Sequence, residues 1–252
     1  MSIFSLEGKS ALVTGAATGL GQAISVALAG QGADVVITDR SEDLLAETAE
    51  LLRPFGRRVA ALGIDVRSLS QIRAGMATAQ GRLGAIDILV NNAGINRPAP
   101  GLEARESEWD DHFNTNVRGG FFMAQAAAPA MIERKWGRII FISSQSGLVG
   151  IPGQPIYCAT KGAVIQLVQT LGLEWAKHGV TVNSVAPTFV ETNLTRARLG
   201  NPEFHRFVLS KIPAGKLATP QDVAAAVVYL ASEQAGMVNC DTLRVDGGWT
   251  AW

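Results

Sequence analysis

Seven short apolar runs, rich in Val, Ile and Leu, recur along this chain with segments of helical spacing between them. Several runs are almost continuously apolar, which is typical of strands covered on both faces. Strands that alternate with helices form right-handed β–α–β crossovers and thereby build a parallel sheet. The predicted strands are Ser10–Thr14, Asp34–Thr38, Val59–Ile64, Ile86–Asn91, Arg138–Ser143, Thr181–Ala186 and Thr242–Val245. The predicted helices lie near 19–31, 42–53, 69–82, 107–134, 157–178 and 221–231.

The alternation continues without a linker or an internal repeat, so we expect one α/β domain over residues 1–252. Chains of ~250 residues with this pattern are commonly single domains. Pro129 lies inside a predicted helix and should kink it or end it early. The span from Glu191 to about Pro220 is too long for an ordinary loop. We interpret 191–218 either as a substrate-binding lid or as a misassigned segment.

Composition excludes several classes of protein. Lys and Arg total 22, as do Asp and Glu, so the chain lacks the basic footprint of a nucleic-acid or anionic-membrane binder. An apolar content of 47% excludes disorder, and the zero net charge favours self-association. The sequence contains neither a signal peptide nor 18 consecutive apolar residues. Cys158 and Cys240 match no disulfide or zinc spacing, which predicts a reducing cytoplasm and no metal site.

A glycine-rich turn follows the first strand directly and leads into a helix. Gly15, Gly19 and Gly21, with Thr18 and Leu20 between them, let the backbone approach a pyrophosphate closely, and the helix N-terminus offers free N–H groups. The spacing is G-x-x-x-G-x-G rather than the common G-x-G-x-x-G. A tight turn without a ligand has the same composition, so this motif alone leaves both interpretations open.

An acidic residue, Asp39, closes the second strand 18 residues after Gly21. In dinucleotide-binding folds an acid about 20 residues beyond the turn binds the adenosine ribose, and its charge repels a 2′-phosphate. We therefore favour NAD, although the adjacent Arg40 can hold the phosphate of NADP. The alternative is that Asp39 caps the helix that follows it.

Two further strand ends carry polar or small residues. Asp65 and Val66 follow the third strand, and Asn92-Ala93-Gly94 follows the fourth. Because ligands gather at the carboxyl ends of parallel strands, Asp65 can accept the adenine amino group and 92–94 can line the groove beside the adenosine. Ordinary turn chemistry also uses these residue types.

Tyr157 and Lys161 stand four residues apart near the start of a predicted helix and share one face. A phenol with an unperturbed pKa near ~10 is a poor base, but a neighbouring ammonium group favours the phenolate. Such a pair is often a plain helix surface. Here Ser144 closes the fifth strand, where its hydroxyl can hold a substrate oxygen, and Asn116 on the preceding helix can hold a proton-relaying water.

These motifs together resemble the short-chain dehydrogenase/reductase family. The matching residues run in order from the glycine-rich turn through 91–94, Asn116, Ser144, Tyr157-x-x-x-Lys161 and 182–183 to Val245-Asp246-Gly247-Gly248. The resemblance implies a single Rossmann-like, doubly wound domain with a seven-stranded parallel sheet, and hydride exchange at nicotinamide C4. It assigns Tyr157 as general acid/base, Lys161 as the group that lowers its pKa and holds the ribose, Ser144 as orienter of the substrate, and Asn116 as part of the relay.

The chain departs from the family pattern after the sixth strand. Pro187-Thr188 stands where many members have Pro-Gly, and the added Cβ narrows the space near the nicotinamide. Backbone contacts from 188 to Val190 are therefore less secure. Thr192 remains placed where a hydroxyl can meet the carboxamide or the pyrophosphate.

Both ends of the chain resemble members that act on sugar alcohols and sugar acids. The candidate pocket residues are polar and lie near strand ends or the lid: Asn96, Arg97, Gln145, Gln154 and Asn193. A polyol needs several such partners, although each residue can equally be surface polarity. The main alternative substrate is a 3-oxoacyl thioester on acyl carrier protein. The non-enzyme alternative is a regulator that binds a dinucleotide without turnover.

Two helices are apolar on more than one face, which indicates a second buried surface. They are the segment from Tyr157 to Lys177 and the one near 119–131. An aromatic tail with Trp249 and Trp252 supports a partner, since exposed terminal tryptophans are unusual. The resemblance adds that such enzymes are commonly homotetramers, so we expect a homotetramer that binds neither nucleic acid nor membrane.

Overall fold

The computed structural model describes residues 2–193 and 195–251 and shows one parallel sheet of seven strands. The strand order is β3-β2-β1-β4-β5-β6-β7, so the sheet grows outward in both directions from β1 and β4. This confirms the predicted α/β fold class with its doubly wound sheet. The strands are β1 (Ser10–Thr14), β2 (Asp34–Asp39), β3 (Val59–Gly63), β4 (Ile88–Asn91), β5 (Gly137–Ile142), β6 (Val180–Pro187) and β7 (Thr242–Val245).

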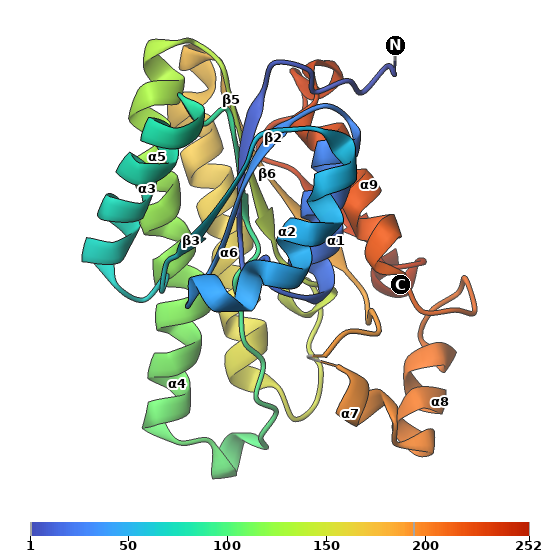
Figure 1. Ribbon diagram of the computed structural model, residues 1–252. Coiled ribbons are helices and arrows are strands. Elements are labelled where there is room, and N and C mark those ends of the chain that lie inside the picture. Colours follow the sequence, from blue (N-terminus) through green and yellow to red (C-terminus); the bar gives the residue numbers. More distant parts are fainter. Residues whose placement is uncertain (1, 194, 252) are drawn as a thin grey trace.

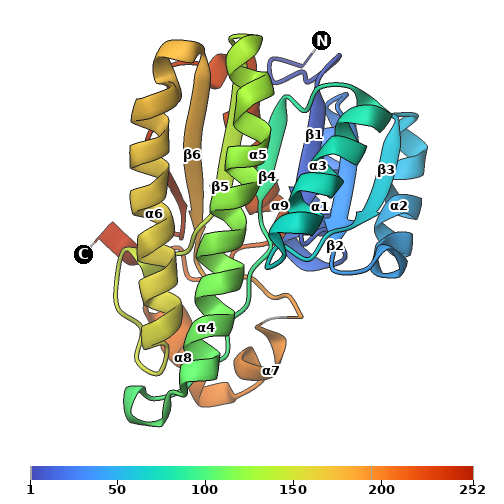
Figure 2. The same cartoon turned by 90° about the vertical axis from the view of Figure 1, so that its left-hand side faces the viewer.

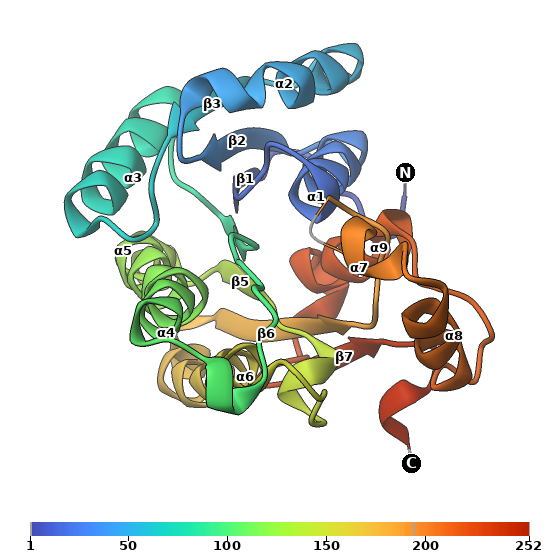
Figure 3. The same ribbon diagram turned by 90° about the horizontal axis from the view of Figure 1, so that it is seen from below.

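Helices cover both faces of the sheet (Figures 1 and 3). One face packs against α1, α2 and α9, and the other packs against α3, α5 and α6 (Figure 2). No described helix is long and apolar enough to cross a membrane. The helices are α1 (Gly19–Gly30), α2 (Ala46–Leu52), α3 (Leu69–Leu83), α4 (Glu106–Phe113), α5 (Gly120–Glu133), α6 (Pro155–Trp175), α7 (Arg196–Leu199), α8 (Pro202–Ser210) and α9 (Pro220–Ala231).

The predicted helix at 107–134 is interrupted at a different place from the one expected. Pro129 lies within α5, which continues to Glu133, so of the two predicted effects, a kink or an early end, the early end is wrong and the kink stays a prediction. A proline removes only one helical hydrogen bond, and the buried Ala128 and Met131 keep this part of the helix packed on the sheet. The irregular turn is instead the π-helical segment Asn114–Gly119, which separates α4 from α5.

The long span after β6 contains two helices that sequence patterning missed. Asn201 is the N-cap of α8, and its side chain accepts hydrogen bonds from the backbone N–H groups of Glu203 and Phe204. Pro202 then occupies the first helical position, where its missing N–H costs nothing. The one-turn helix α7 precedes α8, and both lie beyond the carboxyl ends of the strands (Figure 1).

Candidate active site

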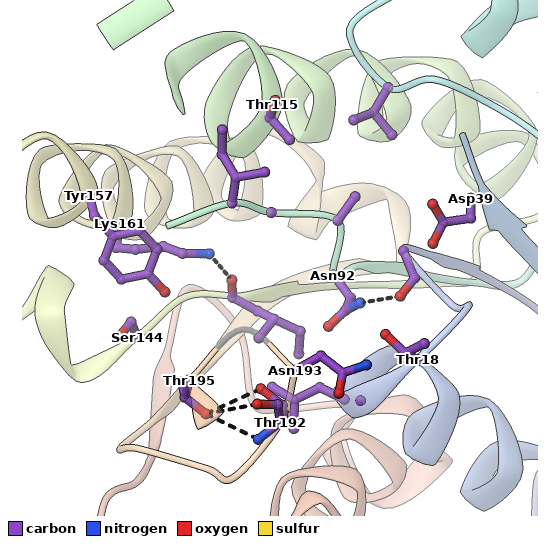
Figure 4. A pocket seen from close by; sticks show the side chains of 18 of the residues that line it. Thr18, Asp39, Asn92, Thr115, Ser144, Tyr157, Lys161, Thr192, Asn193 and Thr195 are labelled. Atoms are coloured by element: carbon purple, nitrogen blue, oxygen red, sulfur yellow. Dashed lines mark hydrogen bonds between the residues drawn. The ribbon is translucent and has the colours of Figure 1, made fainter. Parts of the chain in front are cut away.

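A cavity of about 600 Å³ opens at the carboxyl ends of the strands (Figure 4). It brings the glycine-rich turn into the same wall as Ser144, Tyr157 and Lys161. The predicted cofactor or catalytic residues in this wall are Gly15, Thr18, Gly19, Leu20, Asp39, Asp65, Val66, Asn92, Ala93, Gly94, Ser144, Tyr157, Lys161, Val190 and Thr192. The predicted residues outside it are Gly21, Asn96, Asn116, Gln145 and Gln154.

The glycine-rich turn admits no side chain at two of its positions. Gly15 has φ +63°, and a Cβ there would lie 2.9 Å from the Cα of Ala93. A Cβ on Gly21 would overlap the carbonyl oxygen of Gly15. The Asn92 amide donates to the carbonyls of Thr14 and Gly15, both at 2.9 Å, and so fixes the turn against the end of β4. Gly21 therefore shapes the cavity without lining it.

Asp39 ends β2 with its carboxylate in the cavity wall. One oxygen accepts a hydrogen bond from the Arg40 backbone N–H at 2.8 Å, and the other accepts from the Ala17 N–H at 3.3 Å. The helical turn that follows has Ser41 as its N-cap, so Asp39 does not cap it. The carboxylate is thus held beside the glycine-rich turn, at the far end of the cavity wall from Tyr157 in Figure 4.

Asp65 also lines the cavity, but it is already engaged. Arg67 donates to both of its oxygens, with Nη2 at 2.8 Å, and this lowers the pKa of the Asp65 carboxyl. Arg67 also lies 3.8 Å from Asp111, which in turn pairs with Arg97. Sequence reasoning missed Arg67 and Asp111 in this wall, and the only signal was an arginine two residues after Asp65.

Tyr157 and Lys161 lie in the first two turns of α6 and face the cavity together (Figure 4). The Lys161 ammonium is buried, donates to the Ile142 carbonyl at 2.7 Å, and lies 5.6 Å from the centre of the Tyr157 ring. Burial lowers the pKa of Lys161 to about 8. Burial also raises the pKa of Tyr157 to about 12, and the hydrogen bond with Ser144 opposes that rise. The Tyr157 phenol is therefore protonated at neutral pH.

Asn116 sits in the π-helical segment, and its side chain is fully occupied. Its Oδ1 accepts from the Ile95 N–H at 2.8 Å, and its Nδ2 donates to the Ile95 carbonyl and to Thr160 Oγ1. Asn116 borders a small void next to the main cavity, and Lys161 borders both. Single π-type turns are frequent at functional sites. The side chain thus joins the π-helical segment to the loop after β4 and to α6.

Three predicted substrate residues form buried amides just outside the cavity wall. The Asn96 amide donates to Gln154 Oε1 at 2.9 Å. Asn96 Oδ1, Gln154 Nε2 and Gln145 Oε1 are buried without hydrogen-bond partners. Arg97 and Asn193, also predicted, do line the cavity.

Other cavity features were not predicted. Thr195 lines the wall, and its hydroxyl accepts a hydrogen bond from the Thr192 N–H at 3.0 Å. The signal in the sequence was a hydroxyl residue three positions after Thr192. Thr188, by contrast, was expected near the nicotinamide; it lines the wall, and its hydroxyl is buried without a partner. His112 is buried and accepts from the Arg97 N–H at 3.1 Å, which holds the loop after β4. Within 2–193 and 195–251, no group of His, Cys, Asp and Glu is arranged to hold a metal.

Comparison with known proteins agrees with this geometry. Residues 15–250 match a family model described as enoyl-(acyl carrier protein) reductase. The chain is 41% identical over 252 residues to the 2-dehydro-3-deoxy-D-gluconate 5-dehydrogenase of Escherichia coli, covering 100% of this chain and 99% of that protein. It is 42% identical over 243 residues to the 3-oxoacyl-(acyl-carrier-protein) reductase FabG of Vibrio harveyi, covering 96% and 98%.

A solved structure extends the comparison. A gluconate 5-dehydrogenase from Burkholderia cenocepacia, in complex with NADP and tartrate, superposes with a TM-score of 0.95 at 38% identity and covers 99% of this chain and 98% of its own. Relatives at these identities over the full length show the family, and the resemblance inferred from the motifs is confirmed. The chain belongs to the short-chain dehydrogenase/reductase family of NAD(P)-dependent oxidoreductases.

Proposed function

We propose that this oxidoreductase transfers a hydride between a nicotinamide cofactor and a secondary alcohol or ketone of a polyol, sugar or sugar acid. One observation carries the proposal: the glycine-rich turn and the Ser144, Tyr157 and Lys161 side chains line a single cavity. The relatives from Escherichia coli and Burkholderia cenocepacia are named as dehydrogenases of sugar acids, which supports this substrate class.

The cavity fits a dinucleotide at the end built by β1, β2 and β4. Its backbone approaches closely at Gly15 and Gly21, where no Cβ has room, and α1 begins there with free N–H groups. We assign cofactor contacts to residues along this wall and on toward α6: Gly15, Thr18, Gly19, Leu20, Asp39, Asp65, Val66, Asn92, Ala93, Gly94, Tyr157, Lys161, Val190 and Thr192. Gly21 keeps the turn tight enough for these contacts.

The residues of α6 supply the proton chemistry. A bound oxidised cofactor supplies the hydride acceptor and a positive charge. The positive charge of the bound cofactor and the Lys161 ammonium would favour the phenolate, so Tyr157 first gives up its own proton toward Lys161. The phenolate Oη then takes the proton of the substrate hydroxyl as its hydride leaves for the cofactor, and Ser144 orients that oxygen. Lys161, with a pKa of about 8, passes the proton onward, and Asn116 holds the π-helical segment beside the void that Lys161 borders. We therefore include Asn116 in the proposed proton relay, because it borders the same void as Lys161.

Asp39 favours NAD over NADP. Its carboxylate lies beside the turn and would face a 2′-phosphate with a like charge. Arg40 also lines this wall and is the residue that opposes the preference. The Burkholderia cenocepacia relative is in complex with NADP. Our preference for NAD in this protein therefore depends on the negative charge of Asp39.

We assign substrate contacts to two residues in the cavity wall and to three amides that lie outside it. Ser144 and Tyr157 hold the reacting oxygen, and the buried amides of Asn96, Gln145 and Gln154 have unmet hydrogen-bonding groups suited to hydroxyls. We propose that residues 191–218 act as the lid of a single domain over 1–252, because Thr192 and Thr195 line the cavity.

We propose a homotetramer in the cytoplasm. Three exposed apolar side chains support assembly: Leu102 in the turn before α4, Trp109 on α4 and Leu173 near the end of α6. Trp249 no longer supports assembly, since it is buried against Phe189 and Phe207 of its own chain, and Trp252 lies outside the described residues. Both cysteines are free, which suits a reducing compartment. A monomer at micromolar concentration in light scattering would overturn the assembly.

The second candidate is reduction of 3-oxoacyl thioesters, favoured by the 42% identity to the Vibrio harveyi reductase. A panel of polyols, sugar acids and 3-oxoacyl thioesters, each assayed with NAD(H) and NADP(H), decides between the two. We expect turnover of polyols or sugar acids with NAD(H). Turnover of thioesters alone would establish the second candidate instead.

A further inference from the structure

Arg198 lies in the one-turn helix α7, which starts at the edge of the cavity. Thr195 lines the cavity, and Leu199 packs in an apolar cluster under the lid. On a helix, residues 195, 198 and 199 share one face, while 196 and 197 lie on the other. Arg196 and Ala197 are exposed. Arg198 therefore belongs to the inward face of α7.

The Arg198 guanidinium has no polar partner among the described residues. Its Nη1 is buried without a hydrogen bond, and no ion pair reaches the group. Every other arginine that is not fully exposed donates to a carboxylate or a carbonyl, as Arg138 does to Ser232 O. The remaining arginines whose side chains have no such partner are all exposed: Arg40, Arg73, Arg206 and Arg244.

Apolar and aromatic groups surround this charge. The guanidinium lies 4.0 Å from the centre of the Phe204 ring, which packs edge-on against Phe189 at 5.5 Å. The same cluster includes Ile151 and Cys158, and Cys158 is the neighbour of Tyr157. Burial lowers the pKa of Arg198, and no acidic group offsets that effect. A desolvated cation without a counterion is costly, so this position is suited to an anion that arrives with a ligand.

We infer that Arg198 binds the carboxylate of an acid substrate, which makes the enzyme selective for a hydroxy acid over the corresponding neutral polyol. The inference rests on the proposed function. A planar guanidinium binds a carboxylate through two parallel hydrogen bonds, and the stacked Phe204 orients it. The diphosphate of the cofactor is the other anion nearby. The aromatic cluster favours the substrate, because it includes Cys158, the sequence neighbour of Tyr157, and contains no residue of the glycine-rich turn.

The test compares Arg198→Met with Arg196→Met, an exposed arginine on the same helix. Each variant is assayed on D-gluconate and on D-glucitol, which share a carbon skeleton and differ in the carboxylate. We expect wild type to prefer the acid, and Arg198→Met to lose about 100-fold in kcat/KM for the acid, mainly through KM, with little change for the polyol. Arg196→Met should behave as wild type. Binding of NAD, measured by fluorescence titration, should be equal in all three proteins.

The remaining outcomes separate the two proposals. If wild type prefers the acid and Arg198→Met keeps that preference, the role of Arg198 is refuted and the sugar-acid function stands. Equal losses on acid and polyol, or weaker NAD binding, would place Arg198 in folding or in cofactor binding and also refute the inference. Turnover of neutral polyols only would refute it while leaving the polyol function. Turnover of thioesters only would remove both proposals together.

Discussion

The two ends of the cavity are built from different materials. At the end near β1 and β2, the backbone forms the surface, through Gly15, Gly21 and the amide of Asn92, which hydrogen-bonds to main-chain carbonyls. At the end near the lid, side chains from separate segments form the surface, among them Ser144 after β5, Thr188 after β6 and Thr195 in the lid. The first end is shaped by the absence of side chains at its glycines, and the second by side chains that project into the cavity from separate segments.

This difference explains how substrate specificity can change while the cofactor end of the cavity stays the same. A turn in which a Cβ would overlap the Gly15 carbonyl tolerates almost no change. A wall of separate side chains can change one residue at a time without disturbing the sheet. Lys161 connects the two ends, because it borders the cavity and is anchored to Ile142 at the end of β5. Variants at each end should therefore fail in different assays.

The largest effect is expected at Tyr157. Tyr157→Phe removes the hydroxyl to which we assign exchange of the substrate proton and keeps the ring, so kcat should fall about 10³–10⁴-fold. The dissociation constant for NAD should stay within about threefold, because the glycine end is unchanged. Steady-state kinetics and fluorescence titration measure the two quantities. Turnover equal to that of wild type would refute the proposed acid/base role.

A helical glycine distinguishes the cofactor end. Gly21→Ala should weaken NAD binding by about 100-fold or prevent folding, since its Cβ would overlap the Gly15 carbonyl. Gly81→Ala is the matched control: Gly81 is also helical, and nothing lies within 4 Å of its added Cβ. That variant should gain about 0.5–1 kcal/mol of stability. Normal NAD binding by Gly21→Ala, measured by calorimetry, would contradict the close packing of the turn.

Asp39 gives a smaller, more selective effect. Asp39→Ala removes the like charge facing a 2′-phosphate and leaves Arg40 in place. The ratio of kcat/KM for NAD over NADP should fall by about 10–100-fold. Asp43→Ala, an exposed acid on the turn after β2, is the control and should leave the ratio unchanged. An unchanged ratio in Asp39→Ala would show that another residue sets the preference.

Sequence reasoning located the sheet and the glycine end because both depend on local patterns. Runs of Val, Ile and Leu mark the strands. Gly15 and Gly21 mark the turn, because a Cβ at either position would collide with the neighbouring backbone. The lid segment was predicted, but its helices α7 and α8 were not, because they are short and depend on tertiary packing. Asn201-Pro202 is compatible with a loop until α8 packs on Trp249.

The unpartnered Arg198 was invisible for a related reason. A sequence shows that a residue is charged, but it does not show whether the charge meets a counterion. The same limit applies to Tyr157, where proximity to Lys161 suggested a lowered pKa. Burial raises the pKa of Tyr157 to about 12, and it is the hydrogen bond with Ser144, rather than Lys161, that opposes the rise.

The smallest effect concerns stability at Lys161. Burial depresses the pKa of this ammonium to about 8 from 10.5, so the folded protein binds fewer protons than the unfolded chain between these values. The free energy of unfolding should therefore rise as the pH increases from about 8 to 10.5, and the full cost of the buried charge applies below 8. Lys161→Met removes that cost together with the hydrogen bond to Ile142.

The first contribution exceeds the second, so Lys161→Met should be more stable than wild type at pH 7 by about 1–2 kcal/mol, although inactive. The gain should be lost by about pH 10.5, where Lys161 is neutral in the folded wild type and the missing hydrogen bond to Ile142 is the main remaining difference. Urea unfolding at fixed protein concentration, at both pH values, measures the difference. A variant less stable than wild type at pH 7 would mean that the bond to Ile142 outweighs desolvation. Lys161 would then stabilise the folded protein where the two ends of the cavity meet, rather than destabilise it as a cost of its role in proton transfer.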